Sequence, residues 1–139
     1  MNQFYSSLIK KFPSEHIKYA FAYGSGVFTQ LNNSAAATKD MKKSSNMIDF
    51  IFVVNNSVMF HADNLKMNKS HYSFLKYLGP YYISRFQDNI PAACYYNTLV
   101  PIKLEDSSVQ HIKYGVISEK MLIQDLYDWD YLYIRYDEY

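Results

Sequence analysis

The sequence predicts an α+β domain in which helices flank a mixed or mostly antiparallel sheet. Two observations support this prediction: β-prone apolar runs occur both early and late in the chain, and helical patterns separate and follow them. The expected order is helix, strand, long polar segment, strand, helices, hairpin and helix, which is typical of the α+β class. Because 49% of its residues are hydrophobic, the whole chain, residues 1–139, fits one domain with a core of its own.

The N-terminal half predicts one helix and two strands. Apolar residues recur at helical spacing within residues 4–12, so a short helix is expected to end before Pro13. The run IKYAFAY, residues 17–23, predicts a strand that ends at the turn GSG. Residues 31–46 are polar and show no apolar period, which predicts a flexible insertion. The run MIDFIFVV, residues 47–54, is nearly continuous in apolar residues, which indicates a central strand.

Two helices are expected in the middle of the chain. The sequence Asn-Asn-Ser at residues 55–57 predicts a turn and a helix cap before the segment 58–68. A second helix is expected over residues 70–79, where a Gly-Pro pair ends it.

The C-terminal part predicts a hairpin and a last helix. Residues 92–102 and 109–118 read as two strands, and the polar sequence KLEDSS forms the turn between them. Ser118 is expected to cap a final helix that continues to about residue 134.

Bulk composition excludes several classes of function. Fourteen basic and thirteen acidic residues give a net charge of +1, so no global field argues for nucleic acid as a partner. The longest continuous apolar run, FIFVV, is far shorter than the roughly 18 residues that span a bilayer. The single Cys94 allows neither an intramolecular disulfide nor a thiolate metal cluster. The sequence therefore predicts a soluble or peripheral protein that does not bind nucleic acid.

The turn GSG, residues 24–26, directly follows the first predicted strand. Glycines at such a turn let the backbone approach a phosphate closely, with amides that point at its oxygens. The turn lacks the Lys-Ser/Thr end of a P-loop and the glycine spacing of a dinucleotide fingerprint. From these residues alone it is either an ordinary strand end or a phosphate cradle.

Asp49 lies between Ile48 and Phe50 in the predicted central strand. An ionised carboxylate in an apolar strand is costly unless it is hydrogen-bonded, paired or bound to a cation. Asp49 is therefore either a satisfied structural acid or a ligand for a divalent metal that neutralises nucleotide phosphates.

Six blocks of this sequence together resemble one enzyme family. In order they are FAYGSGVFTQ, MIDFIFVV, NLKMNKSHYSFLKYLG, YYNTL, IKYGVIS and DLYDWDYLYI, between about residues 17 and 134. They resemble the mitochondrial CDP-diacylglycerol synthases of the translocator-assembly-and-maintenance type, which are phosphatidate cytidylyltransferases. The resemblance implies a nucleotidyltransferase fold of the DNA-polymerase-β type. It also implies that CTP and phosphatidic acid give CDP-diacylglycerol and pyrophosphate for cardiolipin synthesis, peripherally on the matrix side of the inner mitochondrial membrane.

The resemblance also implies roles for particular residues. Asp49 would hold Mg²⁺ as the cofactor, and Lys113, with Tyr114 beside it, would lie near a substrate phosphate. Asp49 and Lys113 are thus the expected catalytic residues, since phosphoryl transfer needs mostly positioning and charge neutralisation. The turn residues expected to grip the CTP triphosphate are Gly24, Ser25 and Gly26. Further residues lie in matching blocks without an expected role: Asn64, Lys66, His71, Tyr72 and Asn97.

Two of the departures of this chain from the family pattern concern the metal site and the C-terminal region. Two residues after Asp49, where the superfamily often has a second acid, this chain has Ile51. The family continues after the sequence LYI with a further helical region that is expected to be absent here. Alternatives are therefore a degenerate, non-catalytic nucleotide-binding or assembly module, and a nucleotidyltransferase with another acceptor. Candidate replacements for the second acid are Asp40, Asp63, Glu105 and Asp106.

Overall fold

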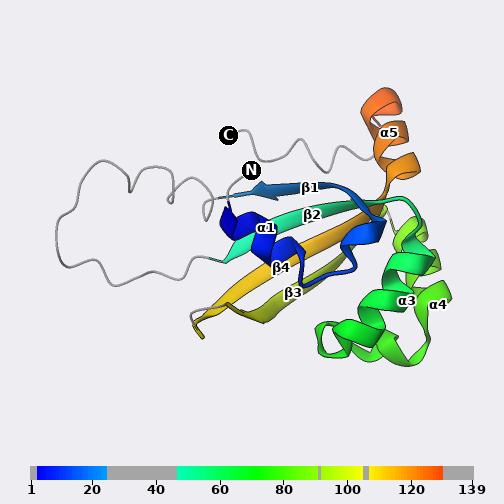
Figure 1. Cartoon of the computed structure of the whole chain (residues 1–139). Coiled ribbons are helices and arrows are strands. Elements are labelled where there is room, and N and C mark those ends of the chain that lie inside the picture. The colour runs from blue at the N-terminus through cyan, green and yellow to red at the C-terminus, as the bar shows by residue number, and fades with distance from the viewer. Residues whose placement is uncertain (1–2, 25–46, 91, 105–106, 130–139) are drawn as a thin grey trace.

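The computed structural model describes residues 3–24, 47–90, 92–104 and 107–129 (Figure 1). Its α-helices are α1 (Gln3–Ile9), α3 (Ser57–Met67), α4 (Pro80–Asn89) and α5 (Glu119–Asp128). Its short 3₁₀ turns are η1 (Ser14–His16), η2 (Lys69–His71) and η3 (Phe74–Tyr77). Its strands are β1 (Ile17–Tyr23), β2 (Ile48–Val54), β3 (Cys94–Lys103) and β4 (Val109–Ser118). The predicted α+β class, with helices flanking a sheet, is confirmed for this part of the chain.

The sheet is mixed, with the strand order β1-β2-β4-β3. β1 pairs antiparallel with β2, β2 pairs parallel with β4, and β4 pairs antiparallel with β3. The predicted hairpin is therefore confirmed as β3 and β4. β2 is a central strand and nearly all of its residues are buried, as its continuous apolar sequence predicts.

The core lies on both faces of this sheet. On one face, which we call the α1 face, Leu8 from α1 and Phe60 from α3 pack against Phe50 and Phe52 of β2. On the opposite face, which we call the α5 face, Leu122 from α5 packs against Ile51 and Val53 of β2. Successive residues of a strand point to opposite faces, so β2 contributes apolar side chains to both layers.

The prediction of a helix over residues 70–79 is wrong. That segment contains the 3₁₀ turns η2 and η3, and the regular helix α4 starts where the predicted one was expected to end. Gly79 has a φ of +86°, and Pro80 is the first residue of α4. A proline suits the first helical position because no helical hydrogen bond needs its missing N–H. The Gly-Pro pair therefore begins a helix here.

Both predicted helix caps are confirmed. The Asn56 side-chain oxygen accepts a hydrogen bond from the Met59 amide at 3.1 Å, and the Ser118 hydroxyl accepts one from the Met121 amide at 3.3 Å. α5 is followed by Trp129, whose φ is +61°. The predicted insertion at residues 31–46 and the continuation of the last helix to residue 134 lie outside the described residues.

Replacing Asn56 with Ala is expected to reduce the free energy of unfolding by about 1 kcal/mol, because an amide at the start of α3 loses its acceptor. Asn55 is the matched control, since it is exposed and precedes the cap; Asn55→Ala is expected to change stability by less than about 0.5 kcal/mol. Urea unfolding of the two variants measures the difference. Equal losses would show that the Asn56 cap contributes nothing specific.

Candidate functional site

The glycine turn and Asp49 lie next to each other in the structure. Gly24 directly follows β1 and has a φ of +81°, a conformation that favours glycine. A Cβ atom at this position would lie 3.4 Å from the Asp49 Oδ2 oxygen. The backbone at the end of β1 thus passes close to the carboxylate of β2. The other two residues of the predicted triphosphate grip, Ser25 and Gly26, lie outside the described residues.

Lys113 lies beside Asp49 on the same face of the sheet. The two residues are partners in the parallel register of β2 and β4, and Tyr23 of β1 is the partner of Asp49 on the other side. Partners in adjacent strands point to the same face. The register of three strands therefore brings an acidic and a basic side chain together next to the glycine turn, on the α5 face.

Tyr96 supports Lys113 from the neighbouring strand β3. The Lys113 Nζ atom lies 4.8 Å from the centre of the Tyr96 ring, a distance at which a cation and an aromatic face attract each other. The ring lies over Gly115, where an added Cβ would come within 2.7 Å of Tyr96 Cε1 and 2.6 Å of Cys94 Sγ. Only a glycine at position 115 leaves room for this arrangement.

The environment on the α5 face keeps the neighbouring groups of the site neutral. Burial raises the pKa of the Cys94 thiol to about 12, so this thiol is not a nucleophile near neutral pH. Burial also raises the pKa of Tyr96 above its usual value. Asp49 is half-buried, with its Oδ1 oxygen out of contact with solvent. Among the described residues, the site therefore offers the carboxylate of Asp49 to a cation and the ammonium group of Lys113 to an anion.

Tyr114 lies on the other side of the sheet from Lys113. It is completely buried in the α1-face core. Its hydroxyl accepts a hydrogen bond from Asn64 Nδ2 at 3.0 Å and lies 3.2 Å from His71 Nδ1. The structure thus brings together Gly24, Asp49 and Lys113 but separates Tyr114 from them.

A buried polar network surrounds the Tyr114 hydroxyl. Asn64 Nδ2 also donates to the Tyr72 hydroxyl at 2.9 Å, and that hydroxyl lies 2.9 Å from His61 Nδ1. His61 Nε2 lies 2.9 Å from Gln87 Oε1. Because that amide oxygen can only accept, His61 Nε2 donates to it and Nδ1 accepts from Tyr72. Three residues without an expected role, Asn64, His71 and Tyr72, thus belong to one network that joins α3 and η2 to β4.

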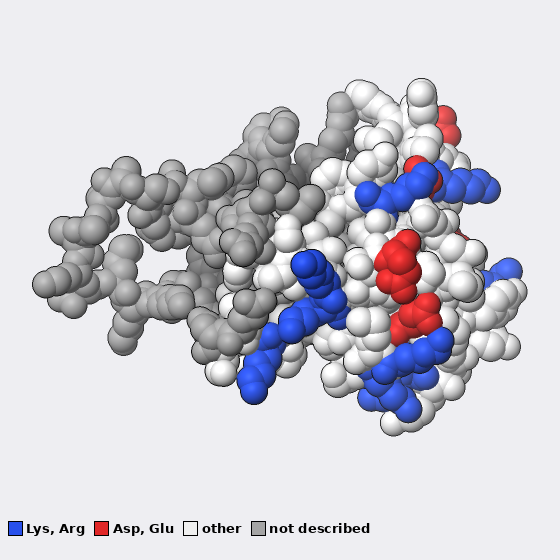
Figure 2. All heavy atoms as spheres, in the orientation of Figure 1, with Lys and Arg blue, Asp and Glu red and all other residues white. Residues whose placement is uncertain are grey.

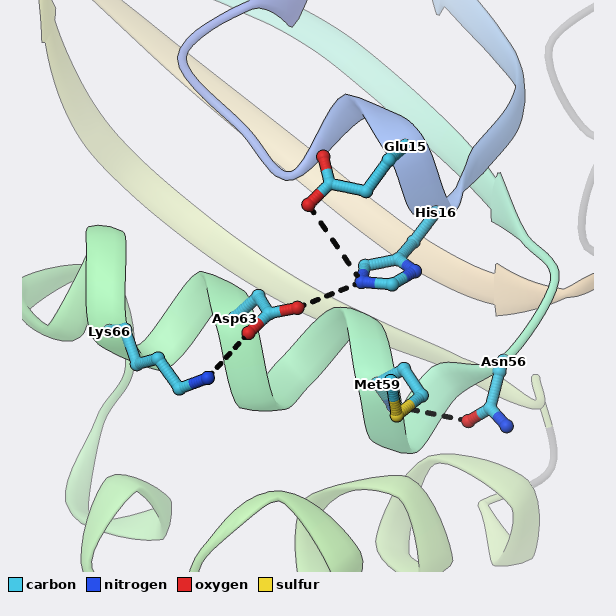
Figure 3. A network of polar contacts seen from close by, with 6 residues as sticks. All are labelled: Glu15, His16, Asn56, Met59, Asp63 and Lys66. Atoms are coloured by element: carbon cyan, nitrogen blue, oxygen red, sulfur yellow. Dashed lines mark hydrogen bonds and ion pairs between the residues drawn. The ribbon is translucent and has the colours of Figure 1, made fainter.

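A second polar cluster lies at the surface between η1 and α3, and Figure 3 shows its geometry. His16 Nε2 lies 2.9 Å from Asp63 Oδ2 and 4.0 Å from Glu15 Oε1. Lys66 Nζ lies 2.7 Å from the other Asp63 oxygen. Asp63 therefore interacts with these two side chains and does not supply the second acid beside Asp49. The other candidate replacements, Asp40, Glu105 and Asp106, lie outside the described residues.

Sequence reasoning missed Tyr96. It is one of fifteen tyrosines, and its type alone does not distinguish it from those that fill the core. A signal did exist: Gly115 interrupts an apolar strand, and glycines in strands often face an aromatic ring across the hairpin. Using that signal requires the register in which Tyr96 is paired with Gly115.

Comparisons with known proteins agree on one family. The family model described as "Phosphatidate cytidylyltransferase, mitochondrial" matches residues 5–135. Proteins of that name from Danio rerio, Homo sapiens and Caenorhabditis elegans are 47%, 45% and 43% identical over 131, 130 and 130 residues. Each of these matches covers 94% of this chain, but only 36%, 26% and 36% of the respective relative. The chain thus spans about a third or less of the length of these relatives.

The buried network is expected to make stability depend on pH through His61. Burial lowers the pKa of His61 from 6.5 to about 4, so between these values the unfolded chain binds a proton that the folded chain does not. The free energy of unfolding is therefore expected to fall by about 3 kcal/mol as the pH drops from 6.5 to 4. Urea unfolding at several pH values measures this slope.

The variant His61→Gln is expected to flatten that slope, although it lowers stability at neutral pH. Burial also lowers the pKa of His71, so a smaller slope of the same sign is expected to remain. Parallel pH curves for the wild type and His61→Gln would rule out this origin of the pH dependence.

Proposed function

Because this chain belongs to the family of mitochondrial phosphatidate cytidylyltransferases, we propose that it binds CTP for transfer of the cytidylyl group to phosphatidic acid. The products are CDP-diacylglycerol and pyrophosphate. The observation that supports this proposal is the position of Gly24, Asp49 and Lys113 together on one face of the sheet. A backbone turn, a carboxylate and an ammonium group are the parts that a triphosphate site requires.

The proposed reaction needs positioning and charge neutralisation. A phosphate oxygen of phosphatidic acid attacks the α-phosphorus of CTP, and the bond from that phosphorus to the departing pyrophosphate breaks. Lys113 lies where its positive charge can offset the charge of the phosphates, with its ammonium group held over the Tyr96 ring. The turn at Gly24 would hold the triphosphate through backbone amides, together with Ser25 and Gly26.

Asp49 fits the role of a Mg²⁺ ligand. Mg²⁺ takes oxygen ligands and is commonly held by one or two protein carboxylates together with substrate phosphates. Asp49 is a half-buried carboxylate beside the glycine turn, so it would hold the ion at the place where the triphosphate enters. When bound, the ion would neutralise phosphate charge.

We propose that Tyr114 supports the site from the opposite face of the sheet and does not contact CTP. It follows Lys113 directly, and its hydroxyl is anchored by Asn64 of α3. This anchor restrains β4 at the point where Lys113 emerges on the other face. The mixed sheet, with a glycine turn after β1 and a carboxylate in the adjacent strand, is the basis on which we assign a nucleotidyltransferase fold of the DNA-polymerase-β type.

A mitochondrial, peripheral location is part of the proposal. The relatives are named mitochondrial, and phosphatidic acid is a membrane lipid, so the protein has to meet a bilayer surface. Within the described ranges, no helix has both the length and the apolar character needed to cross a membrane. We place the chain on the matrix side of the inner membrane.

Asp49→Asn is expected to weaken CTP binding at least about tenfold in the presence of Mg²⁺, because the carboxylate that would hold the ion is lost. Without Mg²⁺ the variant and the wild type are expected to bind CTP equally weakly. Titration calorimetry with and without the ion measures both affinities. Asp128→Asn is the matched control, since Asp128 is an exposed carboxylate on α5.

The activity itself is tested by incubating the chain with CTP, Mg²⁺ and phosphatidic acid in vesicles and measuring CDP-diacylglycerol. Formation of this product, lost in Asp49→Asn and kept in Asp128→Asn, is the expected result. If the wild type forms no product and binds CTP with no dependence on Mg²⁺, the proposal is wrong and the chain is a non-catalytic module.

A further inference from the structure

An exposed aromatic surface lies away from the candidate site, on η3 and α4. Leu75 and Ile83 of this region are buried and anchor it to Tyr72 and Tyr95. Six large apolar side chains around these anchors point to solvent, with exposed fractions from 47% to 78%. They form what we call the aromatic patch: Phe74, Tyr77, Leu78, Tyr81, Tyr82 and Phe86.

The aromatic patch is built on an ordered backbone. Gly79 and Pro80 turn the chain between η3 and α4, which lets both elements contribute to one short stretch of surface. The rings of Tyr81 and Tyr82 contact each other edge to face, with centroids 5.6 Å apart. Large exposed apolar patches are rare on monomeric soluble proteins, and those that occur often mark interaction surfaces.

The segment that carries this surface is mostly basic. From residue 69 to residue 87 the chain contains Lys69, Lys76 and Arg85 and no acidic residue. Asp88 is the first acid that follows, and its carboxylate lies near enough to Arg85 for the two charges to interact. Lys76 Nζ lies 5.4 Å from the centre of the Tyr77 ring, so positive charge and aromatic surface adjoin. In Figure 2, basic side chains gather at the lower right of the molecule, and acidic side chains lie directly above them.

We propose that the aromatic patch docks on the surface of a bilayer that contains anionic phospholipid. Tyrosine and phenylalanine rings are stable at the level of the headgroups, where one end of the ring is apolar and the other is wet. Neighbouring lysine and arginine side chains are attracted to anionic headgroups. A second copy of the chain fits this surface poorly, because a symmetric contact would bring the same cations face to face.

This inference deepens the proposed function, and it rests on that function only in the choice of phosphatidic acid as the anionic lipid. Binding to vesicles needs neither CTP nor turnover. Conversely, CTP binding can be measured without lipid. The two proposals can therefore fail separately. Vesicle binding without CTP binding or activity would refute only the proposed function, and CTP binding without vesicle binding would refute only the docking surface.

The first test is co-sedimentation of the chain with vesicles of phosphatidylcholine, with or without phosphatidic acid. Binding is expected only when phosphatidic acid is present. The double variant Lys76→Gln/Arg85→Gln is expected to bind roughly 25-fold more weakly, at about fivefold for each positive charge removed. The double variant Tyr81→Ser/Tyr82→Ser is expected to lose about tenfold or more. Tyr127→Ser is the control, because Tyr127 is a tyrosine on α5 that is even more exposed than Tyr81 and Tyr82.

A label at a defined position tests which surface meets the lipid. Cys94 is the single cysteine and is buried, so the variants Tyr82→Cys and Tyr127→Cys can each be labelled selectively with an environment-sensitive fluorophore. Vesicles containing phosphatidic acid are expected to shift the emission of the label at position 82 to shorter wavelength. The label at position 127 is expected to stay unchanged.

Three results would overturn the inference. One is binding of both double variants as tightly as the wild type, with folding verified by circular dichroism. Another is a shift of the label at position 127 and none at position 82. The third is a wild type that ignores vesicles but dimerises in solution, with the dimer abolished by Tyr81→Ser/Tyr82→Ser, which would make the aromatic patch a contact between two copies of this chain.

Discussion

The parallel pairing of β2 with β4 is the constraint on which the candidate site depends. It sets Asp49 directly beside Lys113, although the two residues are far apart in the sequence. Because side chains alternate along a strand, a shift of the register by one residue would turn one of the two to the opposite face. The specific contacts of the buried β2 side chains, with Leu8 and Phe60 on one face and Leu122 on the other, oppose such a shift. The same packing that stabilises the fold therefore determines the geometry of the charged pair.

The two faces of the sheet carry different groups: the candidate site lies on the α5 face and a buried polar network on the α1 face. On the α5 face, the turn at Gly24 and the ring of Tyr96 border the charged pair. On the α1 face, Tyr114 is tied to Asn64 and His71 in a network with little access to water. Buried hydrogen bonds of this kind are costly to break once formed, since each unpaired group would lose its partner without gaining water. The network thus ties β4, next to Lys113, to α3 and η2.

Much of the local structure could be predicted from the sequence, because local patterns determine it. The strand at residues 17–23, the central strand and the Asn56 and Ser118 caps follow from hydrophobic pattern and capping chemistry. The helix expected over 70–79 was wrong because a Gly-Pro pair can end one helix or begin another. The parallel pairing of β2 and β4, and with it the role of Tyr96, could not be predicted because it joins strands that are distant in the chain. Gly24 and Asp49 were identified as candidates, and the structure shows that they adjoin.

We propose that CTP and a divalent ion bind together where the glycine turn meets Asp49 and Lys113. Mn²⁺ takes the same oxygen ligands as Mg²⁺, and its unpaired electrons broaden the NMR signals of nearby nuclei. In the presence of CTP, Mn²⁺ is predicted to broaden the amide signals of Gly24, Asp49 and Lys113 most strongly. Broadening centred on the surface cluster of Glu15, His16 and Asp63, or broadening that does not depend on CTP, would show that the ion does not bind together with CTP beside Asp49.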